Sequence, residues 1–311
     1  MMQLKMRQLR VFEAVATSSS FSRAAEQLAM TQPAVSMAVR QTEQALGTAL
    51  FDPLNRHRLS DAGQALLMHA RIILAQVRAA EEAMAFYSAE GRQQGTAQLQ
   101  GLLHLGVVQT ANYFAPRLLS QFHAQHPDVH LKLTVAKRVD IVRLLAERRL
   151  DIAITGSPPS EADLDAVSFA RHPHCLVAAA QHRLARRPQL QWADLRDEPF
   201  IFREPGSSTR LFLEQLLQAQ ALPITPGLEL SGNETVKHAV MENLGISLLS
   251  AHVFQVELAA QRIAVLDVVG MPKLIDWCFI HRRDAQLNAV NAAFKAFVLA
   301  EGARVAACVL N

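Results

Sequence analysis

The first sixty residues alternate apolar and polar positions with the period of short helices. Apolar side chains recur at helical spacing over 4–15 and again over 21–28, where small alanines allow helices to approach closely. A third helix is predicted over 31–46, because Thr31 can cap its first N–H groups and Gly47 can end it. Short helices joined by tight turns in this way predict a helix-turn-helix.

A short basic hairpin pattern follows these helices. Residues 50–60 combine an apolar start, a turn-prone centre and alternating basic positions, which predicts a two-stranded wing. Of the 31 basic and 28 acidic residues in the chain, seven and four lie in the first 60, which leaves 24 of each sign in the remainder. The net positive charge therefore lies entirely in a predicted winged helix-turn-helix at residues 1–60, where it can face phosphates.

A long helix is predicted next, over residues 61–92. Its apolar or small positions alternate by four and three, a period that favours pairing with a second helix over packing on the same chain. We predict that this linker helix forms a dimer, and packing on its own chain is the alternative. The positions of the predicted seam are Leu66, Ala70, Ile73, Val77, Ala80, Met84 and Tyr87.

Beyond a polar linker with Gly91 and Gly95, strands and helices alternate to the end of the chain. This alternation predicts an α/β domain over 97–311, with mixed, mainly parallel sheets covered by helices on both faces. Strands are predicted over 102–108, 131–135, 151–154, 175–179, 200–202, 246–249 and 277–281, and helices over 114–123, 141–148, 211–219, 235–242 and 287–299.

Composition and missing motifs exclude several classes of protein. Half of the 311 residues are hydrophobic, but no apolar run reaches the length of a membrane span and no signal peptide is recognised, so we expect a cytoplasmic protein without membrane contact. Cys175, Cys278 and Cys308 lack zinc or redox spacing and are interpreted as buried hydrophobes. His172 and His174 have no carboxylate to complete a metal site and are interpreted as solvated or capping histidines. We predict no metal, no cofactor, no catalytic residues and no enzyme activity, since the common catalytic motifs are missing.

The predicted helix-turn-helix carries side chains suited to reading DNA. Glutamine pairs with adenine, arginine with guanine or phosphate, and serine with either, while basic wing residues suit the backbone or the minor groove. Together with the basic charge, this pattern predicts double-stranded DNA as a partner. The predicted DNA-binding residues are Ser22, Arg23, Gln32, Pro33, Ala34, Ser36, Met37, Arg40, Arg56 and Arg58.

A second candidate site lies in the α/β region. Residues 205–209 precede a helix and offer free N–H groups and several hydroxyls, with Arg203 and Arg210 on either side, which favours an anion site over an ordinary helix cap. Ligands of open α/β sheets lie beyond the carboxyl ends of strands, so the turns after the first strands are predicted to complete the site. The predicted residues are Gln109, Thr110, Ala111, Asn112, Lys137, Arg138, Thr155, Arg203, Gly206, Ser207, Ser208 and Thr209.

The motifs of the first 90 residues resemble those of LysR-type transcriptional regulators, bacterial dimers or tetramers that bind promoter DNA. Ala38, where that family often has a longer polar residue, is expected to cost a base contact, and Pro53, in place of an arginine, is expected to stiffen the wing. The matching segments are Leu9-Arg10-x-Phe12, Phe21-Ser22-Arg23-Ala24-Ala25, Thr31-Gln32-Pro33-Ala34-Val35-Ser36, Leu46-Gly47 and Leu50-Phe51.

The resemblance continues through the rest of the chain. It implies a two-lobed effector domain similar to type 2 periplasmic binding proteins, with the ligand between lobe I, at about 97–170 and 268–311, and lobe II, at about 171–267. The matching segments are Leu105-Gly106, Leu150-Asp151-Ile152-Ala153-Ile154, Arg203-Glu204-Pro205-Gly206-Ser207-Ser208-Thr209-Arg210 and Gly245-Ile246-Ser247-Leu248-Leu249.

The resemblance also implies partners. They are promoter DNA, a second copy of the chain in a homodimer that assembles to a homotetramer, a small anionic metabolite, and RNA polymerase. Segments 113–116, 203–210 and 233–237 are most similar to the branch that controls Rubisco and Calvin-cycle operons, and Asn233 joins the predicted effector-binding residues. Ser157 departs from that branch, which tends to carry arginine there. The alternative is a regulator of sulfur, nitrogen or aromatic-acid metabolism with a non-phosphorylated effector, whereas the basic N-terminal domain argues against a solute-binding protein.

Overall fold

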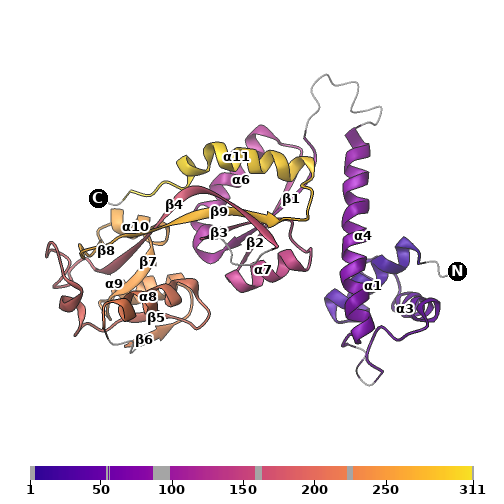
Figure 1. Cartoon of the computed structure of the whole chain (residues 1–311), viewed down its shortest axis with the longest axis horizontal. Coiled ribbons are helices and arrows are strands. Elements are labelled where there is room, and N and C mark those ends of the chain that lie inside the picture. The colour runs from indigo at the N-terminus through magenta and orange to yellow at the C-terminus, as the bar shows by residue number, and fades with distance from the viewer. Residues whose placement is uncertain are drawn as a thin grey trace. The chain divides into compact units, whose positions relative to one another are not determined.

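The computed structural model describes residues 4–53, 55, 57–86, 99–157, 163–222 and 227–309 (Figure 1). The chain divides into two compact units, Met1–Ala97 with Glu147–Arg149, and Gln98–Ala146 with Leu150–Asn311. Each of these units has its own hydrophobic core. No helix in the described part of the chain has the length and apolar character that crossing a membrane requires.

The N-terminal unit contains the predicted helices. Thr31 caps the third of them by accepting a hydrogen bond from the Ala34 amide at 3.4 Å, and Gly47 ends it in the left-handed conformation, as predicted. Phe12 and Val35 are buried where the first three helices meet. The helices are α1 (Met6–Ser18), α2 (Phe21–Gln27), α3 (Gln32–Leu46) and α4 (Asp61–Phe86).

The predicted wing is a small antiparallel hairpin. Phe51 pairs with Leu59, and the Asp52 amide donates to the Arg58 carbonyl at 2.9 Å. The His57 ring contacts the Ser19 carbonyl at 2.8 Å, which ties the hairpin to the turn between α1 and α2. Leu54 and Arg56 lie outside the described residues, and so does the DNA contact predicted for Arg56.

The packing of helix α4 differs from the predicted dimer seam at two positions. Ala70 is fully buried and Leu66 partly buried in the core of the same chain, because the small alanine lets α1 approach α4. Packing on its own chain therefore explains these two positions, and assigning them to the seam was wrong. Ile73, Ala80 and Met84 are exposed and Val77 partly so, while Tyr87 lies outside the described residues.

The C-terminal unit is built on a mixed sheet. Among the described residues, seven strands join it in the order β2-β1-β3-β9-β4-β7, with β8 also paired to β4, and β5 pairs with β6 separately. The strands are β1 (Gly101–Val108), β2 (Val129–Ala136), β3 (Ile152–Gly156), β4 (Leu164–Ala179), β5 (Ile201–Arg203), β6 (Leu228–Leu230), β7 (Ser247–Ser250), β8 (Ile263–Val265) and β9 (Lys273–Arg282).

The expectation of mainly parallel sheets is wrong. Strand β1 is parallel to β2 and β3, and β5 is parallel to β6, but β9 runs antiparallel to β3 and β4, and β4 runs antiparallel to β7 and β8. The cause is that the long strands β4 and β9 pass between two lobes as one antiparallel pair. Only residues 175–179 of β4 were predicted, since Pro173 and the polar side chains before it resemble a loop.

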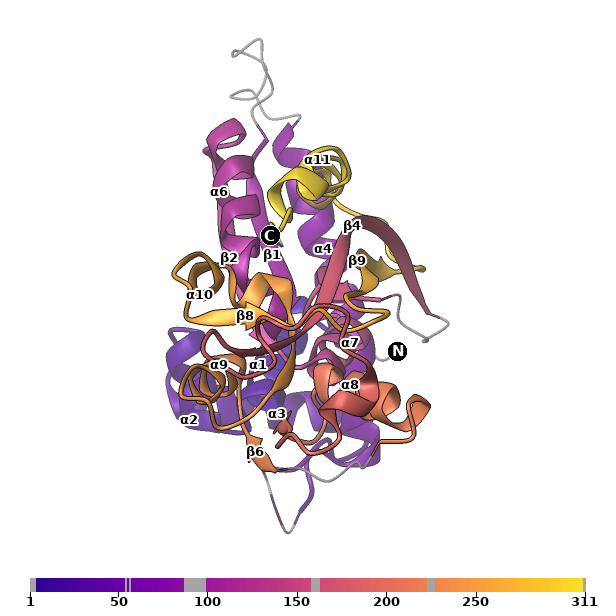
Figure 2. The same ribbon diagram turned by 90° about the vertical axis from the view of Figure 1, so that its left-hand side faces the viewer.

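Helices cover both faces of the sheet in lobe I, as predicted. Helices α6 and α11 pack on one face through Phe122 and Phe294, and α7 packs on the other through Ile141 (Figure 2). Lobe II comprises β5 to β8 and the helices between them. The helical segments are η1 (Gln109–Tyr113), α6 (Ala115–Gln125), α7 (Arg138–Ala146), η2 (Trp192–Leu195), α8 (Ser208–Ala219), α9 (Asn233–Met241), η3 (Ala251–Val253), α10 (Gln255–Ala259) and α11 (Ala289–Val305).

Candidate functional site

Helix α3 presents a polar surface on the side away from the core. Val35 and Val39 anchor the helix in the N-terminal unit, so residues four apart on the other side face outward. Gln32 and Arg40 are exposed, and Met37 exposes 60% of its surface. The other predicted α3 residues are Pro33, which is exposed, and Ala34 and Ser36, which are partly buried.

The predicted contacts outside α3 are also at the surface. Ser22 and Arg23 lie exposed in the first turn of α2, which Ser20 caps by accepting from the Arg23 amide at 3.4 Å. Arg58 is exposed on the wing. Together with the outward side of α3, these exposed residues of α2 and the wing have the arrangement of a recognition helix with flanking groups that can contact the DNA backbone.

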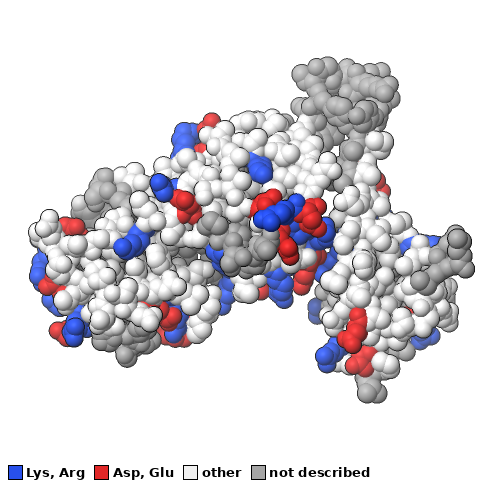
Figure 3. All heavy atoms as spheres, viewed as in Figure 1, with Lys and Arg blue, Asp and Glu red and all other residues white. Residues whose placement is uncertain are grey.

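In Figure 3, basic and acidic side chains are interspersed over the visible face of the C-terminal unit.

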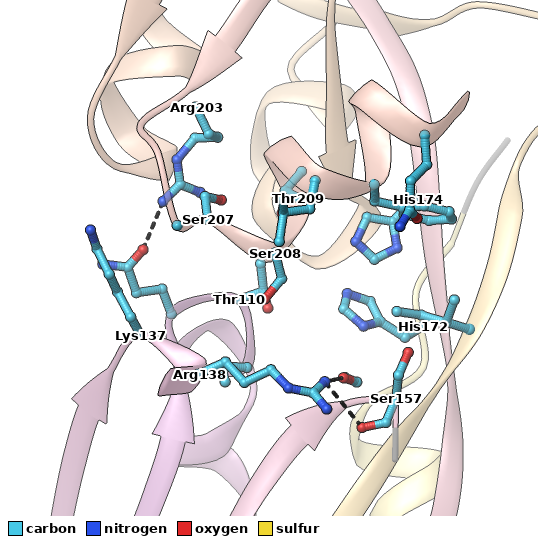
Figure 4. Close-up of a pocket in the computed structure, with 18 of the residues that line it drawn as sticks. Thr110, Lys137, Arg138, Ser157, His172, His174, Arg203, Ser207, Ser208 and Thr209 are labelled. Atoms are coloured by element: carbon cyan, nitrogen blue, oxygen red, sulfur yellow. Dashed lines mark hydrogen bonds between the residues drawn. The ribbon is translucent and has the colours of Figure 1, made fainter. Parts of the chain in front are cut away.

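A cavity of about 620 Å³ lies between the lobes of the C-terminal unit (Figure 4). It is bounded by the carboxyl ends of β1, β2 and β3, the first turn of α8 and the middle of β4. We refer to it as the interlobe cavity. Its lining residues are Val108, Gln109, Thr110, Ala136, Lys137, Arg138, Gly156, Ser157, His172, His174, Arg203, Gly206, Ser207, Ser208, Thr209, Leu211, Phe212, Gln215 and Ile275.

Most of the predicted anion-site residues meet in this cavity, and four do not line it. Ala111 is buried in the lobe I core, and Asn112 is exposed outside the cavity. Thr155 is buried behind the wall, where its hydroxyl donates to the Ser157 carbonyl at 3.4 Å. Asn233 contacts the cavity only indirectly, by accepting a hydrogen bond from Arg203.

The N-terminus of α8 opens into the interlobe cavity. Ser207 occupies the cap position, but its hydroxyl makes no capping hydrogen bond, and Gly206 precedes it in the left-handed conformation. An ordinary cap would hold that hydroxyl on the helix. Gly206, Ser207, Ser208 and Thr209 all line the cavity, so the start of α8 borders it, and a helix N-terminus with nearby hydroxyls is the arrangement of an anion site.

Of the two arginines that flank residues 205–209, Arg203 lines the cavity and Arg210 does not. Arg203 lines the cavity, but its guanidinium is held by Glu204 at 2.8 Å and by Gln109 at 2.7 Å. Burial alone would raise the pKa of Glu204, yet hydrogen bonds from Arg203 and from the Gly232 amide lower it to about 2. Arg210, which was expected only to flank the site, does not line the cavity, and Glu214 and Glu229 bind its guanidinium.

Two further cations stand at the start of α7. Arg138 Nη1 donates to the Gly156 carbonyl at 2.7 Å and to the Ser157 carbonyl at 3.4 Å, which fixes the arginine against the end of β3 (Figure 4). Lys137 lines the cavity without an ion pair to any described residue. Its charge is therefore available to a ligand.

Two histidines of β4 are the residues that sequence reasoning missed. His172 and His174 are 2% and 3% exposed and line the cavity, so interpreting them as solvated or capping was wrong. His172 stacks on Trp277, with ring centres 3.7 Å apart. Burial lowers the pKa of His172 well below its usual value and that of His174 to about 4, so both rings are neutral at pH 7. Two histidines at i and i+2 share one face of a strand, a signal that would have found them had β4 been predicted in full.

Both parts of the chain match models of one family. Residues 6–64 match the bacterial regulatory helix-turn-helix protein, lysR family, and residues 96–303 match the LysR substrate binding domain. The full-length structure of CbnR with its target DNA shares the fold, with 22% identity, a TM-score of 0.64, and coverage of 95% of this chain and 99% of that one.

Relatives of higher identity are named as regulators. The chain is 43% identical to the HTH-type transcriptional regulator CbbR of Rhodospirillum rubrum, over 95% of this chain and 96% of that protein. It is 38% identical to the RuBisCO operon transcriptional regulator of Allochromatium vinosum, over 98% of each. The Synechocystis CcmR regulatory domain, solved in complex with 2-PG, covers 65% of this chain and 97% of its own length at 33% identity and a TM-score of 0.62. As the motifs indicated, the chain belongs to the LysR family of transcriptional regulators, which are not enzymes, with a DNA-binding helix-turn-helix and an effector-binding domain.

Proposed function

We propose that this regulator binds the promoter of a RuBisCO operon and responds to a small phosphorylated anion in the interlobe cavity. Relatives named for the RuBisCO operon or as CbbR, similar over nearly the whole chain, support the target. The observation that carries the effector class is the N-terminus of α8, which shares one cavity with Lys137, a cation that has no ion pair with a described residue. The binding of 2-PG, 2-phosphoglycolate, to the related Synechocystis domain supports it further.

The cavity supplies the groups that a phosphate needs. Backbone N–H groups at a helix start and the hydroxyls of Ser208 and Thr209 can donate to phosphate oxygens, and the positive end of the helix dipole favours the negative charge. Lys137 adds a full charge from lobe I, opposite the helix in lobe II. A ligand held by both lobes would stabilise one arrangement of the lobes over others, which is how an effector shifts a regulator between states.

We expect 2-phosphoglycolate to raise the unfolding temperature of the full-length protein in scanning fluorimetry. At 100 times its Kd a ligand adds about 2.7 kcal/mol to the stability, which is roughly 5–10 °C for a domain of this size. The variant Lys137→Gln should bind roughly tenfold or more weakly, since it loses a charge-assisted contact.

This experiment has two controls, a variant at another basic residue in α7 and a ligand without the phosphate. Arg143→Gln removes an exposed charge of α7 outside the cavity and should leave the shift unchanged. Glycolate, which lacks the phosphate, should give no shift. Stabilisation by an aromatic or other non-phosphorylated acid, with no response to phosphate esters, would support the alternative effector class and contradict this proposal.

DNA recognition by α3 is the second part of the proposed function. Gln32→Ala and Arg40→Ala are each expected to weaken binding to the specific promoter by roughly 1–3 kcal/mol, the usual cost of a lost bidentate base contact. Binding to unrelated DNA should change by less than about twofold, because that binding depends on phosphate contacts. Fluorescence anisotropy at fixed salt, with both DNAs, measures the two affinities.

The matched control is Gln27→Ala, an exposed glutamine at the end of α2. It should leave both affinities unchanged, and an equal loss on both DNAs in the Arg40 variant would assign that arginine to phosphate instead of a base. The same titration gives the number of protein chains bound to each DNA.

We propose a homodimer that assembles to a homotetramer through the exposed apolar residues of α4. The regulator works in the cytoplasm, where bacterial promoters lie, and contacts RNA polymerase.

A further inference from the structure

His174 lines the interlobe cavity with a buried ring nitrogen that has no hydrogen-bond partner among the described residues. It is 3% exposed, and the unpaired atom is its Nδ1. Folded proteins rarely leave buried polar atoms unpaired, because such an atom loses its hydrogen bonds to water and gains none in return. A polar side chain left in this state in the wall of a ligand cavity is suited to pair with the ligand.

Each neighbouring histidine has at least one ring nitrogen with a partner in the protein, although Nδ1 of His172 is also buried without one. His172 Nε2 contacts the Ser250 hydroxyl at 2.9 Å, and that hydroxyl contacts His252 Nδ1 at 3.2 Å. His252 Nε2 contacts the Ala306 carbonyl at 2.9 Å. These contacts, together with the stacking of His172 on Trp277, make His172 and His252 parts of the frame. His174 is the histidine of the cavity that has no such role.

The surroundings of His174 are uncharged. Its ring lies 4.2 Å from that of His172 and 5.2 Å from that of Phe212, centre to centre, and Ile275 is part of the same lining. In Figure 4, Lys137 and Arg203 lie on one side of the cavity and the two histidines on the other, with Ser208 and Thr209 between them. Arg138 is held against the carbonyls of residues 156 and 157. Lys137 and Arg203 make one side of the cavity cationic, whereas Arg138 lies beside Ser157 and is bound to these two carbonyls. We call the part lined by His174, Phe212 and Ile275 the neutral side.

The neutral side selects a particular chemical group. Burial lowers the pKa of His174 to about 4, and a neutral imidazole offers one donor and one acceptor. A hydroxyl can donate and accept, so it can pair with either nitrogen. A second carboxylate or phosphate can pair only with the N–H of the imidazole, and it would be buried away from Lys137 and Arg203, so 2-phosphoglycolate should bind through its phosphate but less tightly than a phosphate ester that ends in a hydroxyl.

We propose that His174 is a specificity-determining residue, which hydrogen-bonds a hydroxyl on the uncharged part of an effector whose phosphate lies at α8 and Lys137. This inference rests on the proposed function, because the phosphate site fixes which end of the ligand reaches β4. It assigns to the chain a subsite that distinguishes hydroxylated phosphate esters from plain ones.

The test compares two phosphate esters of the same length by isothermal titration of the full-length protein. Glycerol 3-phosphate and propyl phosphate both carry a three-carbon chain, and only the former has hydroxyls. We expect wild-type protein to bind glycerol 3-phosphate about tenfold more tightly, a difference of about 1.4 kcal/mol that one good hydrogen bond can supply.

Two variants locate this preference at His174. His174→Phe replaces the imidazole by an aromatic ring without nitrogens. Glycerol 3-phosphate should therefore bind about tenfold more weakly, while propyl phosphate binds as before. His174→Gln restores a polar group and should recover part of the preference. A purely structural role would weaken both esters equally. The matched control is His123→Phe, which replaces an exposed histidine on α6 outside the cavity and should change neither affinity.

The outcomes separate this inference from the proposed function. Equal affinities of wild-type protein for both esters, or an unchanged preference in His174→Phe, would overturn the inference and leave the phosphate site in place. If neither ester binds while the protein still binds DNA, the phosphate site itself is wrong, and the inference is overturned with it. The wild-type comparison decides the first point even where a variant fails to fold.

Discussion

Replacing Gly63 by alanine is expected to destabilise the N-terminal unit strongly and to weaken promoter binding. Gly63 lies in the first turn of α4, and a Cβ on it would lie 2.0 Å from the Leu50 carbonyl oxygen. That oxygen already accepts from the Ser60 amide at 3.0 Å, and the Ser60 hydroxyl in turn accepts from the Gly63 amide at 3.0 Å. Backbone held on both sides cannot move away cheaply, so the clash should cost about 3 kcal/mol or more.

Scanning calorimetry of the full-length protein measures this loss. For a unit of this size, 3 kcal/mol lowers the midpoint of unfolding by more than about 10 °C, whereas the transition of the C-terminal unit should stay in place. DNA binding should fall with the folded fraction, because Leu50 and Leu59 carry the base of the wing beside α3.

Gly47→Ala is the matched control. Gly47 has a positive φ, +68°, which Gly63 does not, but a Cβ on Gly47 would meet nothing within 4 Å. The substitution should cost only the strain of a left-handed alanine, about 1 kcal/mol. If Gly63→Ala were no less stable than Gly47→Ala, the close approach of α4 to the wing would not be essential, and the N-terminal unit would be far more tolerant than its geometry indicates.

The N-terminal unit could be predicted from the sequence because its signals are local. The cap at Thr31, the stop at Gly47 and the apolar period of α1 act within a few residues of the chain. The α4 seam was partly wrong for the opposite reason. A heptad pattern records that a face is apolar, but it does not record whether Ala70 meets a second chain or the preceding helix α1.

The C-terminal unit shows the same division between local and distant causes. The rule that ligands lie beyond strand ends led to Gln109, Thr110 and Lys137, which the structure places in one cavity. The support expected from Arg210 beside the site could not be judged from the sequence, because its partner Glu229 lies nineteen residues away, on β6. His174 was misread because its burial depends on β9 and α8, which are distant in sequence.

Acidification from pH 7 to pH 5 is expected to destabilise the C-terminal unit by about 4 kcal/mol. Burial lowers the pKa of His174 and of His252 to about 4, from 6.5 when the chain is unfolded, and lowers that of His172 as well. Below pH 6.5 the unfolded state therefore binds more protons than the folded state. The free energy of unfolding falls as the pH is lowered, until the histidines of the folded state also become protonated near pH 4. Each of the first two histidines contributes about 2 kcal/mol at pH 5.

Between pH 7 and pH 5 the expected loss of stability comes from these histidines and not from Glu204. Glu204, whose pKa is lowered to about 2, stabilises the fold above its unfolded value of 4.5, and its contribution is lost only below that pH. Thermal unfolding at pH 7, 6 and 5 should show the midpoint of the C-terminal unit falling by roughly 10 °C in total. The N-terminal unit serves as an internal reference, since none of these three histidines lies in it.

His174→Phe should remove about 2 kcal/mol of this pH dependence while leaving the stability at pH 7 nearly unchanged, because the buried Nδ1 of His174 has no hydrogen-bond partner among the described residues. His123→Phe, at an exposed position, should leave the pH dependence as it is. An undiminished loss of stability in His174→Phe would mean that folding does not lower the pKa of His174. The ring would then become protonated near pH 6.5, as in the unfolded chain, and below that pH an effector with two charged ends would fit the β4 side of the interlobe cavity better than one with a hydroxyl.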